Sequence, residues 1–220
     1  MDTVKVYIDW YSQPSRAVAA LCLLANIPHE IIETQLFRGD TRTKEFQAIS
    51  PPMTVPAIVH QEMPLYESHA ILTYLSTAFN VADHWYPKDP KQRANVDAYL
   101  HWHHGNIRYG CAGYLYRKII KPRLTGRQIT PEMEKQMLAI QHKSLKYVDE
   151  ILMNNHYVAK TKEMSIADIS CYCEIMQLHL IDFEYRQYPF IVRWMREIGE
   201  IPEVKLVHQR LMKMVQKPKL

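Results

Sequence analysis

The spacing of apolar residues changes repeatedly along the first third of the chain, from the alternation of a strand to the three- and four-residue steps of a helix. Strands are predicted at residues 4–9, 30–36, 57–60 and 64–66. Helices are predicted at residues 14–26, at residues 44–49 and, beginning at Glu67-Ser68, over the stretch that carries Ile71, Leu72 and Leu75. This order, βαβαββα, predicts a mixed sheet whose first two strands are joined by a right-handed crossover.

From residue 89 onward the pattern is entirely helical. A long first helix carries one apolar stripe, formed by Val96, Tyr99, Leu100, His103 and Ile107. Three glycines in its later half weaken it, each by roughly 1 kcal/mol relative to alanine. Further helices are predicted to begin at Thr130-Pro131, at Ser165 and after residue 186, the last region being divided in two at Pro202.

The two patterns are separated by residues 79–89, which are rich in proline and aromatic side chains. We therefore predict an α+β protein with a thioredoxin-like domain at residues 1–78, a linker at residues 79–89 and an all-helical domain at residues 90–220. Ser165 and Asp168 have the spacing of a capping box, so we assign them to folding rather than to catalysis.

The composition argues against a nucleic-acid or membrane partner. Among 220 residues, the 27 lysines and arginines exceed the 23 aspartates and glutamates by four, and the charges are interspersed. The N-terminus lacks the charged start and apolar run of a signal peptide, and no stretch approaches the ~20 apolar residues of a membrane span. We therefore expect a cytoplasmic protein that neither binds nucleic acid nor crosses a membrane.

Neither the cysteines nor the histidines predict a metal site or a disulfide framework. We expect reduced core residues at the four cysteines, Cys22, Cys111, Cys171 and Cys173. His101 and His104 share a helix face with no third ligand at suitable spacing. For the cluster of His101, His103 and His104 we favour a surface or dimer-interface role.

Residues 54–75 combine two features that suit a peptide-like anionic ligand. Val55-Pro56 precedes a strand, and a cis bond there would expose the backbone of Val55 at the edge of the sheet. Glu67-Ser68 stands at the first turn of the next helix, where unpaired N–H groups and the helix dipole favour an anion. The alternative is that Pro56 only ends a loop and that Ser68 only caps a helix.

Several stretches resemble the theta class of the glutathione transferases. The most specific is SQPSRA at residues 12–17, directly after the first strand, and Val55-Pro56 with Glu67-Ser68 is similar to the family's glutathione site. Other similar stretches are YES at residues 66–68, AILTYL at residues 70–75 and DHWYP at residues 83–87. The resemblance covers essentially the whole chain and implies the family's fold, a thioredoxin-like domain followed by an all-helical C-terminal domain.

The resemblance implies two catalytic residues. Ser12 would donate a hydrogen bond to the sulfur of glutathione, which favours the thiolate and lowers the pKa of the thiol. Arg108 would lie near the active site and stabilise charge on the thiolate or the leaving group. The implied glutathione-binding residues are Gln13, Thr41, Arg42, Thr54, Val55, Glu67 and Ser68, and the implied electrophile pocket contains Trp10 and Tyr11.

Each of these residues also has an ordinary structural interpretation. Ser12 could be a turn or cap residue, Gln13 a solvated loop amide and Arg108 a helix-surface arginine. For Arg16, in the first turn of the helix that follows, we favour a structural role over an effect on the sulfur.

Three residues, at two sites, depart from the family pattern. Thr41 and Arg42 stand where a His-Lys pair usually meets the glycine carboxylate of glutathione; arginine can replace the lysine, but Thr41 cannot supply the imidazole. Thr54 stands where a lysine is common. These departures leave the affinity for glutathione open.

The resemblance therefore implies a detoxifying enzyme that conjugates the glutathione thiolate to small electrophiles such as alkyl halides and epoxides. It implies a homodimer with glutathione as co-substrate and no further cofactor. Peroxide reduction or dehalogenation would use the same thiolate. The competing hypothesis is a catalytically weak module that keeps the fold and binds glutathione or another protein.

Overall fold

The computed structural model describes residues 3–215 and divides the chain into two units. One unit contains the chain up to Lys88 together with the chain from Glu200 onward, and the other is Asp89–Gly199. The predicted domain limits at residues 78 and 90 stay a proposal. Residues 1–2 and 216–220 of those domains lie outside the described residues.

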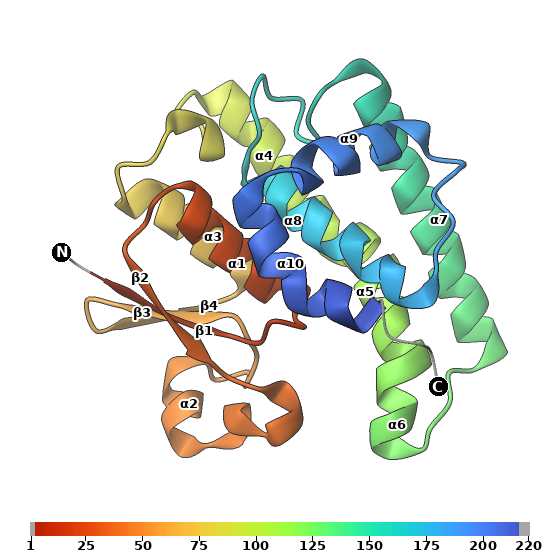
Figure 1. Ribbon diagram of the computed structural model, residues 1–220, viewed down its shortest axis with the longest axis horizontal. Helices are drawn as coiled ribbons and strands as arrows, with labels where there is room; N and C mark the ends of the chain where they lie inside the picture. The colour runs from red at the N-terminus through yellow and green to blue at the C-terminus, as the bar shows by residue number, and fades with distance from the viewer. Residues whose placement is uncertain (1–2, 216–220) are drawn as a thin grey trace. The chain divides into compact units, whose positions relative to one another are not determined.

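The first unit is built on a four-stranded mixed sheet, which confirms the predicted fold class. Its strands are β1 (Val4–Ile8), β2 (His29–Glu33), β3 (Ala57–His60) and β4 (Met63–Tyr66). The sheet has the order β2-β1-β3-β4, with β1 parallel to β2 and β3 antiparallel to both of its neighbours. Figure 1 shows α1 (Gln13–Leu24) and α3 (Ser68–Ala78) on one face of the sheet and α2 (Lys44–Ile49) on the other.

Two of the predicted boundaries in this unit differ from the observed ones by more than one residue. The helix predicted to reach residue 26 ends at Leu24, because Asn26 adopts a left-handed conformation with φ 52°. The second strand ends at Glu33 rather than at residue 36, because Leu36–Arg38 turns into a short 3₁₀ helix. A second 3₁₀ turn follows at Asp40–Arg42 and a third at Asp83–Trp85.

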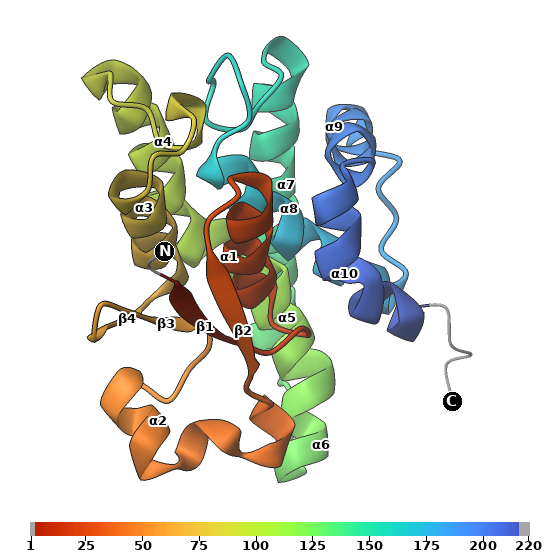
Figure 2. The same ribbon diagram turned by 60° about the vertical axis from the view of Figure 1, so that its left-hand side comes forward.

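The last helix, α10 (Pro202–Val215), packs against α1 within the first unit. Figure 2 shows the two helices side by side. Val204, Val207 and Leu211 form the buried face of α10, and eight consecutive residues of α1 are buried. The helix that comes last in the sequence therefore completes the core beside the first strand and helix.

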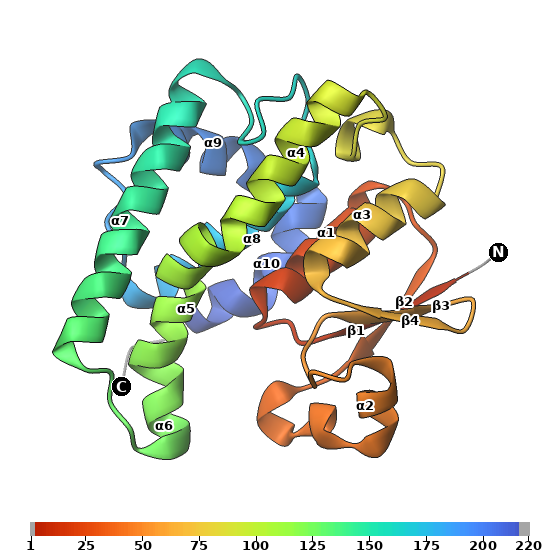
Figure 3. The same cartoon turned by 180° about the vertical axis from the view of Figure 1, so that it is seen from behind.

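The second unit is organised around α8 (Ile166–Met176), all of whose residues are buried. It also contains α4 (Pro90–His103), α5 (Ala112–Leu115), α6 (Lys121–Thr125), α7 (Pro131–Asn154) and α9 (Pro189–Gly199). A 3₁₀ turn at Gln177–Ile181 follows α8, and π-helical segments lie at His104–Arg108 and Tyr116–Ile120. Figure 3 shows α4 lying across α8.

One of the three glycines after α4 has a packing role. A Cβ atom on Gly110 would lie 2.6 Å from the backbone of Gln141 on α7, a distance that real Cβ atoms essentially never show. The buried side chain of Gln141 donates a hydrogen bond to the carbonyl of Gly110 at 2.8 Å. Glycine at this position therefore lowers the helix propensity but allows two helices to approach closely.

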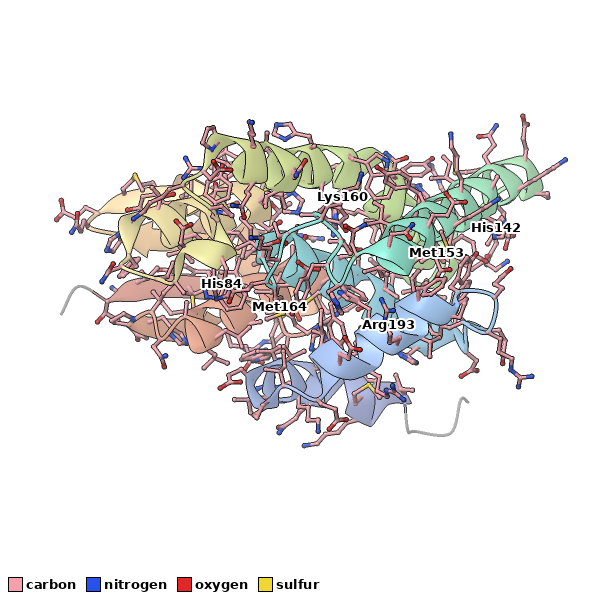
Figure 4. The ribbon with its side chains drawn as sticks, turned by 90° about the horizontal axis from the view of Figure 1, so that it is seen from above. His84, His142, Met153, Lys160, Met164 and Arg193 are labelled. Atoms are coloured by element: carbon pink, nitrogen blue, oxygen red, sulfur yellow. The ribbon has the colours of Figure 1, made fainter. Side chains whose placement is uncertain are left out.

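Polar contacts join α7 to the segment that contains α9. Arg193 donates to the carbonyl of Leu152 at 2.7 Å, and His142 is hydrogen-bonded to the hydroxyl of Tyr188 at 2.6 Å. Arg193 and His142 are both labelled in Figure 4. Both hydrogen bonds satisfy polar groups where α7 meets the segment that contains α9.

The predicted capping box at the start of α8 is confirmed, and Asp168 does more than the pattern implied. Its carboxylate accepts hydrogen bonds from the N–H and the hydroxyl of Ser165 at 3.0 and 3.1 Å. It also accepts from the N–H of Val158 at 2.9 Å and from the indole N–H of Trp194 at 3.3 Å. Burial raises the pKa of Asp168 to about 6, against the effect of these bonds.

Substituting Asp168→Asn is expected to lower the free energy of unfolding by about 1–2 kcal/mol, because an amide offers one acceptor oxygen where four donors converge. Urea unfolding followed by circular dichroism measures this. Asp89→Asn is the control, since Asp89 caps α4 at an exposed position and asparagine caps helices as well as aspartate. Equal, small effects in both variants would contradict the prediction.

Candidate active site

Ser12 lies in the loop between β1 and α1, at the N-terminal end of the helix. Its extended backbone, with φ −80° and ψ 123°, makes it the residue before the first helical turn, and Pro14 follows at a position that helices favour. The N–H of Ser12 donates to the carbonyl of Asp9 at 2.9 Å. Among residues 3–215 the Ser12 hydroxyl has no hydrogen-bond partner, and the residue is half-buried. The hydroxyl is therefore available to a ligand.

Asp9 holds this loop in place, although it was assigned no role from the sequence. It is buried, and its carboxylate accepts from the N–H of Tyr11 and from the N–H of Leu36, each at 2.9 Å. The carboxylate thereby ties the loop after β1 to the loop after β2. Aspartate side chains that follow a strand often accept a hydrogen bond from the backbone two residues later. This pattern could have predicted the role of Asp9 from the sequence.

Arg16 has the structural role favoured from the sequence. It is fully buried, and its guanidinium donates to the carbonyl of Trp10 at 2.9 Å. His208 of α10 is buried nearby, and burial together with the charge of Arg16 lowers the pKa of His208 to about 3. His208 is therefore neutral at physiological pH, and the cationic charge at this point belongs to Arg16.

The peptide bond between Val55 and Pro56 is cis, as the sequence suggested. The side chain of Val55 is buried in a small cluster with Phe46 and Ala57. The residue before it, Thr54, is exposed, and its carbonyl accepts from the hydroxyl of Ser50 at 2.9 Å. Only the backbone of Val55 therefore remains for contact with a ligand.

Glu67 stands just before α3 with φ 70° and ψ 109°. Residues other than glycine rarely adopt a positive φ, and such residues gather at functional sites. Glu67 is exposed and Ser68, the first residue of α3, is half-buried. The pair is therefore accessible at a helix N-terminus, where the backbone favours an anionic group.

The loop after β2 presents Arg42 but not Thr41. Arg42 is exposed, whereas Thr41 is only 5% exposed. Gln13, in the first turn of α1, is half-buried. Of the two residues at the position of the usual His-Lys pair, Arg42 is thus the accessible one.

Trp10 and Tyr11 differ in their surroundings. Tyr11 is 41% exposed. Trp10 is half-buried, and the guanidinium of Arg210 lies over its ring, 5.7 Å from the centroid. Trp10 also lines a cavity of about 310 Å³ together with residues of α1, β2 and α10. The contact with Arg210 was not predicted from the sequence.

In the second unit, Arg108 forms an ion pair with Glu174 of α8, a contact that sequence reasoning missed. Arg108 ends a π-helical segment and is 39% exposed, whereas Glu174 is 2% exposed. The Nε2 atom of His103 lies 3.7 Å from the same carboxylate. Burial opposes ionisation of Glu174, but Arg108 and His103 outweigh it, and the pKa of Glu174 falls to about 2.

The surface or interface role expected for the histidine cluster is wrong for His103. Its side chain is buried beside Glu174, with its Nδ1 atom 3.3 Å from the hydroxyl of Tyr99, while His101 and His104 are exposed. His103 is on the apolar stripe of α4, which explains its burial. Within residues 3–215, no group of three or more histidine, cysteine or acidic side chains could hold a metal ion.

All four cysteines are free and buried, as predicted. Burial raises the pKa of Cys22 to about 12 and raises the pKa of Cys111 and of Cys171. These thiols are therefore poor nucleophiles. In the described part of the chain no helix is long and apolar enough to cross a membrane.

Comparison with known proteins identifies the family. A family model described as glutathione S-transferase, N-terminal domain, matches residues 7–84. Glutathione S-transferase T1 of Arabidopsis thaliana is 40% identical over 185 residues, which cover 83% of this chain and 75% of that protein. Glutathione S-transferase theta-3 of Mus musculus is 34% identical over 173 residues, which cover 79% and 72%.

Solved structures agree with these relatives. The crystal structure of human glutathione transferase theta-2, in complex with glutathione and an unknown ligand, superposes with a TM-score of 0.88 at 28% identity. The match covers 97% of this chain and 89% of that one. Because identity to the plant and mouse proteins exceeds 30% over most of both sequences, the chain belongs to the theta class of the glutathione transferase family.

Proposed function

We propose that this protein conjugates the thiolate of glutathione to small electrophiles such as alkyl halides and epoxides, and that Ser12 keeps the bound sulfur ionised. The observation that carries the proposal is the position of Ser12 at the N-terminal end of α1, with a hydroxyl that no group among residues 3–215 uses. A hydrogen bond donated to the charged form of a thiol lowers its pKa. The positive end of the helix dipole acts in the same direction.

The glutathione molecule is assigned to the first unit. We propose that the backbone of Val55 pairs with the cysteinyl part, that Glu67 and Ser68 hold the γ-glutamyl group, and that Arg42 holds the glycine carboxylate. The accessibility of Glu67, Ser68 and Arg42 supports these assignments. Gln13, Thr41 and Thr54 complete the proposed set, Thr41 through its backbone because its side chain is buried.

We propose that Trp10 and Tyr11 contribute to the electrophile pocket and, as a separate proposal, that Arg108 stabilises charge that develops during the reaction. Arg108 keeps 39% of its side chain exposed despite its ion pair, which supports this second role. We further propose that the protein acts as a cytoplasmic homodimer in detoxification and needs no cofactor besides glutathione. Size-exclusion chromatography with light scattering tests the dimer.

The activity is tested by passing the protein over immobilised glutathione and then assaying an alkyl halide, an epoxide and cumene hydroperoxide. We expect retention on the column and turnover of at least one of these substrates. Turnover of the hydroperoxide alone would identify peroxide reduction as the principal use of the thiolate. Retention with no turnover of any substrate would instead favour the binding-module hypothesis.

Substituting Arg42→Ala is expected to raise the KM for glutathione about 10-fold, because a charge-assisted hydrogen bond to the glycine carboxylate is lost. The KM for γ-glutamylcysteine, which has no glycine, should not change. Arg38→Ala is the matched control, since Arg38 lies in the same loop, is 70% exposed and meets Asp40 at 4.0 Å. A similar rise with both substrates would show that Arg42 acts elsewhere.

A further inference from the structure

We propose that Arg210, on the last helix, is a positioning residue for the loop that carries Ser12. The inference rests on the proposed role of Ser12, and every residue in it belongs to the first unit. Nothing in the local sequence pattern points to it, because Arg210 is 177 residues from the partner that holds it, Glu33.

Arg210 joins three parts of the first unit. Its two terminal nitrogens donate to the two carboxylate oxygens of Glu33, at 2.6 and 2.9 Å. The same guanidinium lies over the ring of Trp10. Since Glu33 is the last residue of β2 and Trp10 is two residues before Ser12, the arginine connects α10 and β2 to the serine loop. The planar guanidinium of arginine can make both contacts at once, whereas the ammonium of a lysine cannot.

The serine loop is held at each residue before Ser12. Asp9 binds the N–H of Tyr11, Arg16 binds the carbonyl of Trp10, and Arg210 covers the ring of Trp10. Within the described residues 3–215, Ser12 itself is held only through its backbone, which donates to the carbonyl of Asp9 and accepts from the N–H of Arg16. The direction of its hydroxyl therefore depends on how well the two preceding residues are held.

The cavity beside Trp10 explains why its ring needs this contact. A space of about 310 Å³ adjoins the ring, so close packing does not restrain it on that side. Without Arg210 the indole would have room to turn into the cavity. The loop would then lose one of the contacts that hold its shape.

The ion pair is present throughout the pH range in which a bound thiol titrates. The hydrogen bonds between Arg210 and Glu33 lower the pKa of Glu33 and raise the pKa of Arg210. Neither group therefore changes charge near neutral pH. A change in the pH profile of an Arg210 variant would reflect the sulfur of glutathione.

The test is Arg210→Met, which keeps most of the aliphatic stem and removes the guanidinium. We expect kcat/KM to fall about 3- to 10-fold, well below the ~100-fold that a 1 Å misplacement of reacting groups can cost. The pKa of the bound glutathione thiol, followed by thiolate absorbance, should rise by roughly half a unit, because the hydroxyl is less well directed. Affinity for S-methylglutathione, which has no thiolate, should stay unchanged, and Arg210→Lys should recover only part of the loss.

Lys205→Met is the matched control, because Lys205 lies on the same helix and forms an exposed ion pair with Glu200 at 2.6 Å. Glu33→Gln is a second test variant. It removes the carboxylate that holds the guanidinium of Arg210 but leaves that guanidinium beside Trp10. If Arg210→Met and Glu33→Gln are folded and leave the thiol pKa at the wild-type value, the inference is wrong. If Ser12→Ala also leaves it unchanged, the proposed function of Ser12 fails instead.

Discussion

Replacing Ser12 with alanine is expected to lower kcat/KM at pH 7 by about 100-fold, the lower end of what removing one preorganised donor costs an enzyme. Among residues 3–215 no group uses the hydroxyl, so its removal leaves none of their buried groups without a partner. Stability should therefore be unchanged. The loss should come from the sulfur alone.

Ionisation accounts for part of the expected loss. A thiol with a pKa of ~8.5 is roughly 3% ionised at pH 7, and one with a pKa of ~6.5 is roughly 75% ionised, a difference of about 25-fold. The nucleophilicity of a thiolate falls as its pKa falls, with a Brønsted slope of about 0.4–0.5. Over two pKa units this lower nucleophilicity reduces the rate by about 6- to 10-fold and so offsets part of the gain from ionisation. The remainder must come from the loss of the hydrogen bond that fixes the sulfur in line with the electrophile.

The pH profile separates these two contributions. In Ser12→Ala the pKa of the bound thiol should rise toward the value for the free thiol, so the deficit should be largest near pH 7 and smaller at pH 9. Ser12→Thr, which keeps a hydroxyl, is the control and should retain the low pKa. A deficit of equal size at both pH values would mean that Ser12 does not act through ionisation.

Arg108→Met is expected to lower the free energy of unfolding by about 2–3 kcal/mol at pH 7. Breaking a buried ion pair by removing one partner typically costs about 3–5 kcal/mol, because the other charge stays buried. The lower figure applies because Arg108 is 39% exposed and His103 remains 3.7 Å from Glu174. In thermal unfolding this corresponds to a fall in Tm of roughly 5–10 °C.

The expected pH dependence follows from the lowered pKa of Glu174. Because this carboxyl has a pKa of about 2 in the folded protein, its ionised form stabilises the fold above its ordinary pKa, and this stabilisation is lost as the pH falls toward 2. The deficit of Arg108→Met should therefore be full at pH 7 and shrink below about pH 4.5.

A double variant and a matched control complete this test. Adding Glu174→Gln to Arg108→Met should recover part of the lost stability, since the charge left without its partner is then gone. Arg117→Met is the control, because Arg117 lies two turns later and contacts the Tyr109 ring and the Gly113 carbonyl. If the double variant is as unstable as the sum of its parts, Arg108 and Glu174 do not act as a pair.

Elements set by local pattern were predicted well. The helix at Lys44–Ile49 and the strand at Ala57–His60 have their predicted limits, and the capping box at Ser165 is present. In each case the information lies within a few residues of the element: apolar spacing, turn residues and caps. The loop that carries Ser12 was found for the same reason.

Contacts between distant residues were not predicted, because no local pattern encodes them. Glu174 lies within an otherwise mostly apolar helix, where its distant partners Arg108, 66 residues away, and His103 explain an ionised carboxylate. The pairing of Glu33 with Arg210 spans 177 residues. The burial of Thr41 likewise depends on packing around a short 3₁₀ turn rather than on spacing.

The burial of the four cysteines bears on how the protein survives its own chemistry. Electrophilic carbon centres, the substrates that we propose for this protein, alkylate accessible thiols. Burial raises the pKa of Cys22 to about 12, so a far smaller fraction of this thiol is ionised at pH 7 than of an exposed cysteine. Under the proposed activity, the buried cysteines should therefore resist alkylation, and glutathione should remain the sulfur that is consumed.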